Sequence, residues 1–164
     1  MLTPIRLSTL ASIEPTPDPQ ARRFLVFGVA GRLCACDLEA VREIVPARAA
    51  TRLPGAPAWV IGLVNLRGTL LTVVDLASRF GSGGGADAMR SIIVVQAAGK
   101  AFGIGVHEVR DVQAVGDDAL EPVDAQRAAG GLVRGLAHVG PARAETALVC
   151  DVEAIAAEAL ALGG

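Results

Sequence analysis

Short apolar runs, broken by glycine, proline and charged residues, follow one another along most of the chain. Runs rich in valine, isoleucine, leucine and phenylalanine that end at turn-forming residues predict β-strands. The runs that predict strands are 24–29, 33–36, 43–45, 60–66, 69–74 and 91–96. Near the end of the chain, Val152, Ile155, Ala159 and Leu160 fall on one stripe and predict a helix from Asp151 to about Leu162. The pattern predicts a mainly β protein with a C-terminal helix.

Aspartates stand where the helical segments are expected to begin. Asp37 can cap a single helical turn through Val41, and Asp75 opens a short helical pattern. Asp151 begins the C-terminal helix. We interpret Asp75 and Asp151 as N-caps worth ~1 kcal/mol each, and not as catalytic acids.

The segment 57–80 predicts a strand, a tight turn, a second strand and a short helix. Gly68 marks the reversal, since glycine takes positive φ without steric cost. Asn65 and Arg67 are the strongly polar side chains between Trp59 and Leu71. From this segment alone, a solvated turn and a recognition site remain equally open for Arg67.

The second half of the chain repeats the first. Aligning Gly31 with Gly99 superposes 24–45 on 92–113 without a gap. Farther on, 60–63 recurs as 133–136 and 73–76 recurs as 149–152, with a second hairpin loop that is three residues longer. A unit that occurs only twice, with short strands and glycine turns, favours two small barrels over a solenoid.

The repeat suggests a domain organisation. We expect a flexible lead-in over 1–21, a first barrel over about 22–80, a linker over about 81–89, a second barrel over about 90–150 and a C-terminal helix over about 151–162. The first hairpin carries Asn-Leu-Arg-Gly where the second has no matching tetrapeptide. This difference makes Asn65, Arg67 and Gly68 candidates for recognition.

Composition excludes several function classes. Fifteen basic and seventeen acidic residues give a net charge of −2, and aromatic residues make up 3%, which disfavours nucleic acid as the main ligand. No uninterrupted apolar run reaches the ~20 residues of a membrane span. The N-terminus lacks a continuous apolar region typical of a signal peptide. We expect a soluble cytoplasmic protein.

Candidate catalytic and metal-binding groups are few. Cys34 and Cys36 would share one face of a strand, and small buried core residues are favoured over metal ligands because His107 and His138 lie at no finger-like spacing. Gly81–Ala86 fits G-x-G-x-x-A, but it follows a helix and precedes a strand, so we interpret it as a linker. The chain has no phosphate-binding, zinc-protease or nucleophile-elbow motif. No catalytic residue, cofactor or metal is predicted.

An ordered set of motifs resembles the CheW-like chemotaxis coupling proteins. The motifs are Phe24-Leu-Val-Phe, Val41-Arg-Glu-Ile, Gly62-Leu-Val-Asn-Leu-Arg-Gly and Val74-Asp-Leu, followed by a second degenerate copy. The resemblance implies two intertwined five-stranded SH3-like barrels without catalytic activity. It also implies an adaptor that joins methyl-accepting chemoreceptors to the regulatory domain of a chemotaxis-type histidine kinase, in an array tied to the membrane only through the receptors.

The resemblance extends to individual positions. Asn65 and Arg67 match the signature turn of the family, Val41 and Glu43 match positions implicated in partner contact, and Gly62 matches a strand glycine that a partner or a neighbouring backbone can approach closely.

Thr72 and Ala77 depart from the family pattern, which often has proline and arginine there. These departures leave open whether the protein serves flagellar chemotaxis or a parallel pathway such as pilus control. The alternative function is an OB-like barrel that binds a nucleic acid or a small ligand, although low basicity and few aromatic residues argue against it.

Overall fold

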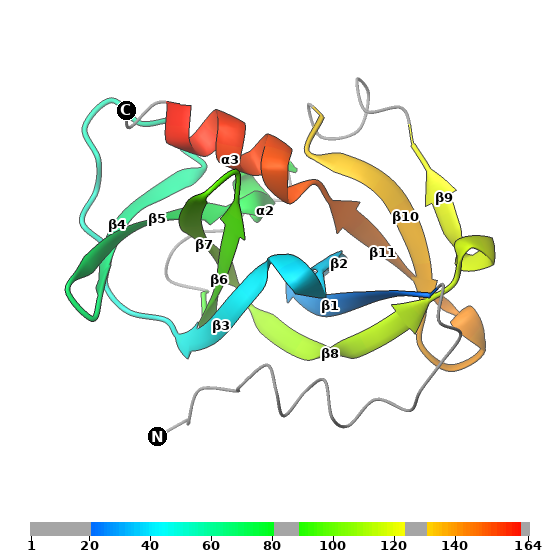
Figure 1. Ribbon diagram of the computed structural model, residues 1–164. Coiled ribbons are helices and arrows are strands. Elements are labelled where there is room, and N and C mark those ends of the chain that lie inside the picture. The colour runs from blue at the N-terminus through cyan, green and yellow to red at the C-terminus, as the bar shows by residue number, and fades with distance from the viewer. Residues whose placement is uncertain (1–20, 81–88, 124–130, 162–164) are drawn as a thin grey trace.

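The computed structural model describes residues 21–80, 89–123 and 131–161, and these contain two β-sheets with few helices (Figure 1). The expected lead-in and linker lie almost wholly outside the described residues, as does the last residue of the expected C-terminal helix. The strands are β1 (Arg22–Val29), β2 (Arg32–Asp37), β3 (Val41–Pro46), β4 (Val60–Leu66), β5 (Thr69–Asp75), β6 (Ser91–Ala97), β7 (Lys100–Val106), β8 (Glu108–Val115), β9 (Leu120–Pro122), β10 (Val133–Val139) and β11 (Glu145–Cys150). The helices are α2 (Leu76–Arg79) and α3 (Val152–Ala161), with 3-10 turns η1 (Leu38–Ala40), η3 (Asp117–Ala119) and η5 (Pro141–Arg143). The prediction of a mainly β protein is confirmed.

Each sheet takes strands from both halves of the chain. Sheet A has the order β8-β1-β2-β11-β10-β9, and sheet B has the order β3-β6-β7-β5-β4. The halves join through two parallel pairs, β2 with β11 and β5 with β7, and through two antiparallel pairs, β1 with β8 and β3 with β6. The expected division at about 22–80 and 90–150 therefore follows the sequence repeat and not the sheets. The hairpin β4–β5 joins β6 and β7 of the second half in sheet B, and the hairpin β10–β11 joins β1 and β2 of the first half in sheet A. Sheet A also has a sixth short strand, β9, beyond the five expected.

The sequence repeat is a structural repeat. Ala30-Gly31 and Ala98-Gly99 form matching tight turns with positive φ at all four residues. The loop between β4 and β5 has two residues and the loop between β10 and β11 has five, Gly140–Ala144, as the alignment predicts. Both hairpins carry a bulge at the same place, between Val60 and Gly62 and between Val133 and Gly135.

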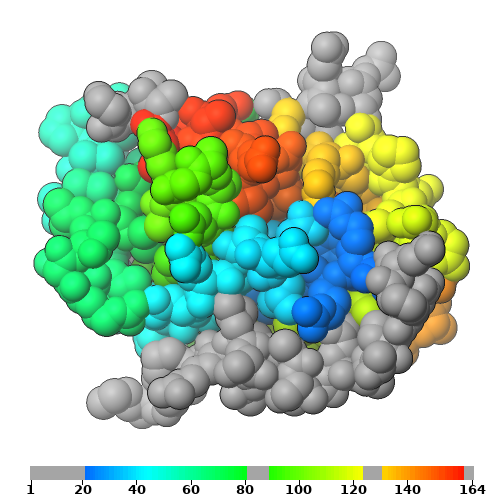
Figure 2. Space-filling view, in the orientation of Figure 1, coloured from blue at the N-terminus to red at the C-terminus, as the bar shows by residue number. Residues whose placement is uncertain are grey.

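The main core takes residues from both sheets and from α3, which contacts β5 and β6. Figure 2 shows α3, in red, on the surface beside the green segment of the second half. Its members from both halves include Phe27, Leu76, Ile93 and Phe102, all fully buried. Val152, Ile155 and Ala159 of α3 are buried as the stripe predicts. Burial of this stripe against both halves holds them together.

Two of the three predicted aspartate caps are formed. The Asp75 carboxylate accepts hydrogen bonds from Ala77 N (3.0 Å) and Ser78 Oγ (3.1 Å), and Asp151 Oδ1 accepts one from Ala154 N (3.1 Å). The prediction for Asp37 is wrong, because its carboxylate makes no cap hydrogen bond and pairs instead with two arginines. None of the helices in the described part of the chain has the length and apolar character of a membrane span.

Candidate partner-binding site

The Asn65–Gly68 turn is shaped by its own side chain. Asn65 Oδ1 accepts a hydrogen bond from Gly68 N (2.8 Å), and Arg67 and Gly68 both take positive φ, at 51° and 85°. This is the backbone of a two-residue hairpin turn whose twist matches that of its strands. Asn65 and Gly68 thus build the turn, and the Arg67 side chain, 66% exposed, is the group that the turn presents.

Arg67, in the turn between β4 and β5, pairs with Glu43 of β3. The strands β3 and β4 lie at opposite edges of sheet B. The hydrogen bond that Arg67 donates to the Glu43 carboxylate raises the pKa of the Arg67 guanidinium above its ordinary value. The structure therefore brings together two residues that the sequence analysis singled out separately. The pair is solvent-exposed, so a charged partner could exchange with either member at little cost.

A groove of about 420 Å³ lies beside this pair. We call it the Arg67 groove; it is lined by Arg42, Glu43, Leu66, Arg67, Thr69, Leu71, Val94 and Ala101. Its walls come from β3, β4, β5, β6, β7 and the β4–β5 turn, and they combine the charged Arg42, Glu43 and Arg67 with apolar side chains. Such a lining suits an apolar ridge of a partner protein that carries a charge at its edge.

Val41 and Gly62 are buried inside the fold. The Val41 side chain is 5% exposed and belongs to the main core. Gly62 has φ 145°, and an added Cβ would collide with the Thr51 carbonyl group. Thr51 N donates to Leu63 O (2.8 Å) and Leu63 N donates to Thr51 O (2.7 Å), so the close backbone at Gly62 is the chain's own loop.

The sequence analysis missed most of the groove. Leu66, Leu71 and Val94 read as strand residues, and only the pairing of strands from both halves places them around one opening. Leu70, 65% exposed, is the one large apolar side chain in the described chain that stands well out in solvent. Leu70 lies on the face of β5 opposite to Leu71 and Val73, and no local sequence pattern distinguishes the groove residues from other strand residues.

The second half has a counterpart with reversed charge. Arg110 of β8 pairs with Glu145 at the start of β11 (2.8 Å), so the arginine lies on the crossing strand and the carboxylate on the hairpin. Arg143 in the hairpin loop pairs with Asp118 (2.9 Å). The β4–β5 and β10–β11 hairpins therefore share a backbone arrangement and differ in the charged side chains that they expose.

The three cysteines and His107 make structural contacts. Cys34, Cys36 and Cys150 are buried and free, and burial is the main cause that raises the pKa of the Cys36 thiol. His107 Nδ1 accepts a hydrogen bond from Ala30 N (2.7 Å), which fixes a turn. Across the described ranges, no three His, Cys, Asp or Glu side chains gather as a metal site would require.

The fold and the site define a class of protein: a pair of interlocked β-barrels that offers grooves and charged turns on its surface. The sequence profile of the CheW-like domain matches residues 23–160, and the chain therefore belongs to the CheW-like family.

Individual relatives agree with this assignment. The chain is similar to the chemotaxis protein CheW of Rhizobium meliloti (strain 1021), with 35% identity over 102 residues that make up 62% of this chain and 66% of the relative. It is 28% identical over 102 residues to the chemotaxis protein CheW of Klebsiella aerogenes, covering 62% of this chain and 61% of that one. Each match spans slightly less than two thirds of the relative's length. The crystal structure of the scaffolding protein TtCheW from Thermoanaerobacter tengcongensis has a TM-score of 0.71 and 27% identity, and the match covers 85% of this chain and 90% of that one.

Proposed function

We propose that this protein is a noncatalytic cytoplasmic adaptor that couples methyl-accepting chemoreceptors to a chemotaxis-type histidine kinase. The observation that carries the proposal is the Arg67 groove, which sits on the fold of the CheW-like family and holds the signature turn. Similarity to a protein described as a scaffold supports the same role. The alternative of an OB-like ligand-binding barrel has no comparable support.

Recognition in this proposal uses surface grooves and charged rims. The kinase regulatory domain, itself of similar fold, docks barrel to barrel at the Arg67 groove, where the apolar lining supplies contact area and Arg67 exchanges Glu43 for a carboxylate of the partner. The helical tip of the receptor lies in a groove between the two barrels. Each interface is modest alone, and avidity in the receptor array supplies the remaining stability.

The proposal is tested by co-sedimentation of the purified protein with receptor signalling-domain fragments and the host's chemotaxis-type kinases. Binding together with a change in kinase autophosphorylation is the expected result. The kinase that responds also decides between flagellar chemotaxis and a parallel pathway, which Thr72 and Ala77 leave open. Failure of folded protein with every cognate pair would overturn the proposal.

The role of the turn is tested by Arg67→Ala. We expect the variant to bind the kinase regulatory domain about tenfold or more weakly, because a partner carboxylate loses a charge-assisted hydrogen bond. Stability should change little, since the lost pair with Glu43 is exposed. The matched control is Arg110→Ala, which removes a similar ion pair from the other end of the molecule. Equal loss in both variants would contradict a specific role for Arg67.

A further inference from the structure

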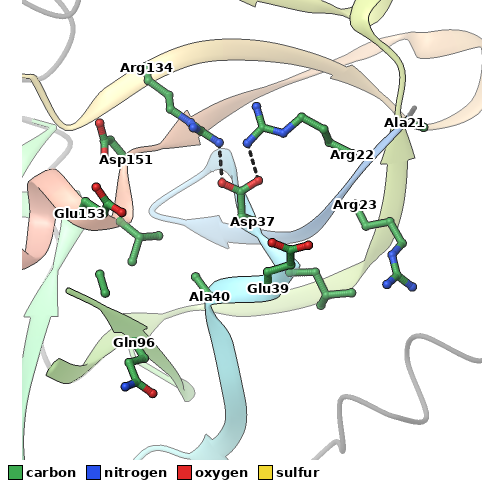
Figure 3. A pocket seen from close by; sticks show the side chains of 13 residues that line it. Ala21, Arg22, Arg23, Asp37, Glu39, Ala40, Gln96, Arg134, Asp151 and Glu153 are labelled. Atoms are coloured by element: carbon green, nitrogen blue, oxygen red, sulfur yellow. Dashed lines mark hydrogen bonds and ion pairs between the residues drawn. The ribbon is translucent and has the colours of Figure 1, made fainter. Parts of the chain in front are cut away.

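A second, larger cleft opens where the two halves of the chain meet, away from the Arg67 groove (Figure 3). Its volume is about 620 Å³, within the range typical of small-molecule and peptide sites. Residues from β1, η1, β6, β10 and the start of α3 contribute to its walls. It shares no residue with the Arg67 groove.

One wall of the cleft carries a charged triad. Asp37 accepts from Arg22 Nη2 through Oδ1 (2.6 Å) and from Arg134 Nη2 through Oδ2 (2.5 Å). The Arg22 guanidinium also lies over the Phe24 ring, 5.2 Å from its centroid. A guanidinium has five N–H groups, so each arginine retains donors while Asp37 holds it in place. The triad is a preorganised pair of cations with a net positive charge.

Three acidic side chains line other parts of the cleft, together with Arg23. Figure 3 shows Asp151 and Glu153 on one flank and Glu39 below the triad. Asp151 is committed to capping α3, but Glu39 and Glu153 have no side-chain partner within the described part of the chain. Between the charged walls, Leu38, Ala97 and Val152 provide an apolar floor.

The fold does not require these charges. In the structural repeat, Gly105 occupies the place of Asp37 and Ile61 occupies the place of Arg134. There the space is filled by apolar atoms, because an added Cβ on Gly105 would collide with the Met89 side chain and lie 3.2 Å from Ile61 Cδ1. The same position is therefore closed by apolar packing in sheet B and left open and charged in sheet A.

We propose that this cleft binds a zwitterionic ligand, in which a carboxylate engages Arg22 and Arg134 and an ammonium group engages Glu39 and Glu153. The aliphatic part between the two charges would rest on the Leu38 and Val152 floor. Such a ligand is either a free amino acid or a segment of a partner protein with an acidic and a basic side chain. The inference is independent of the coupling role.

The test uses nitrogen–proton correlation NMR of the full-length protein. Glycine, β-alanine, γ-aminobutyrate and ε-aminocaproate are titrated as free zwitterions, and acetyl-Glu-Ala-Ala-Lys-amide is titrated as a segment of polypeptide. At least one of them should give saturable shifts at Leu38, Ala40 and Val152. Binding of the free compounds alone indicates a small-molecule ligand, and binding of the blocked peptide alone indicates a partner segment.

Single-charge analogues and variants make the test specific. Butyrate and butylamine should bind about tenfold or more weakly than the best zwitterion. Arg134→Met should weaken both the zwitterion and butyrate, whereas Glu153→Gln should weaken the zwitterion and leave butyrate unchanged. Arg134→Lys, which keeps the charge, guards against a loss caused by misfolding, and Arg110→Met is the control outside the cleft. The proposal is overturned if no probe gives saturable shifts up to tens of millimolar, or if the variants bind as the unaltered protein does.

Discussion

Two arginines stand at corresponding hairpin tips in a backbone conformation that L-residues rarely take. Arg67 has φ 51° and Arg143 has φ 55°, and their side chains are 66% and 56% exposed. The left-handed region costs a non-glycine residue roughly 1–2 kcal/mol. Each arginine is held there by its hairpin and pairs with a carboxylate of another element. Neither is needed for the core, which is what we expect of groups kept for recognition.

Gly62 lies in β4 of the Arg67 hairpin, where the backbone of Thr51 packs closely against it. We predict that Gly62→Ala destabilises the protein by about 3 kcal/mol or more, because the new Cβ meets the Thr51 carbonyl and the backbone has φ 145°. Urea unfolding at equilibrium measures the change. The matched control is Gly55→Ala, which also has positive φ (80°) but open space around it, and it should cost only about 1 kcal/mol. Equal costs for the two variants would show that the collision with Thr51 is not the cause.

Glu145 gives a pH-dependent contribution to stability. The hydrogen bond from Arg110 holds the pKa of the Glu145 carboxyl below its ordinary value of 4.5. A depressed pKa in the folded state stabilises above the unfolded value, and that stability is lost as the pH falls through the folded value. Unaltered protein should therefore be more stable than Arg110→Met near neutral pH, and the difference should vanish as the pH drops well below 4.5. Denaturant midpoints of both proteins from neutral to acid pH measure it, and a difference that persists in acid would rule out this ion pair as its source.

Individual residues were predictable where the local backbone decides their role. Asp75 and Asp151 were found as caps because a cap uses only neighbours in sequence. Asp37 was misread, since charge-assisted hydrogen bonds from Arg22 and Arg134 outcompete a neutral backbone N–H. Those arginines come from other strands, and nothing in the local sequence shows them.

At the scale of elements, α3 is tied down by an ion pair as well as by its apolar stripe. Arg79 at the end of α2 makes two hydrogen bonds through Nη2 to Glu158 (3.1 and 3.0 Å) and lies 5.7 Å from the Trp59 ring. The two helices and the residue before β4 therefore meet at one guanidinium. The contact places the single tryptophan of the chain beside the last helix, where it can report on the helix.

We predict that Glu158→Gln loosens α3 without unfolding the sheets. The loss of global stability should stay below about 1 kcal/mol, since the pair is 27% and 38% exposed. Trp59 fluorescence should change as Arg79 is released, and amide exchange should quicken in α3 before it does in β6. Glu153→Gln on the same helix, where the side chain has no partner within the described residues, is the control. Unchanged fluorescence and exchange in Glu158→Gln would show that the stripe alone holds the helix.

The strand and hairpin elements were largely predictable, because each is set by a local run of apolar residues and a glycine turn. β4 was found with its observed limits, and the repeat correctly aligned β10 with it. The exchange of hairpins between the halves has no local signal. For the same reason the lining of the Arg67 groove, which combines Glu43, Leu71 and Val94, was not predicted.

For the whole molecule, the exchange means that neither half contains a complete sheet. We predict that fragments 1–80 and 89–164 do not fold alone, because sheet A lacks β8 to β11 in the first and sheet B lacks β3 to β5 in the second. Mixing the fragments should restore β structure. Circular dichroism and a cooperative thermal transition measure both results. A cooperative transition in either fragment by itself would contradict the prediction.

The parallel pairing of β2 with β11, in which Cys34 lies opposite Leu148, affects the order in which the protein can fold during synthesis. A ribosome releases the chain from its N-terminus, so β1 and β2 emerge long before the hairpin that must lie beside them. Sheet B can assemble once β7 has appeared, but sheet A stays open until almost the last strand is translated. Until then, one side of β2 is an unpaired strand edge, the kind of surface that invites association with other chains. The interval between the translation of β2 and that of β11 is therefore the period in which this edge is most exposed to association with other chains, and slow translation before β10 would lengthen it.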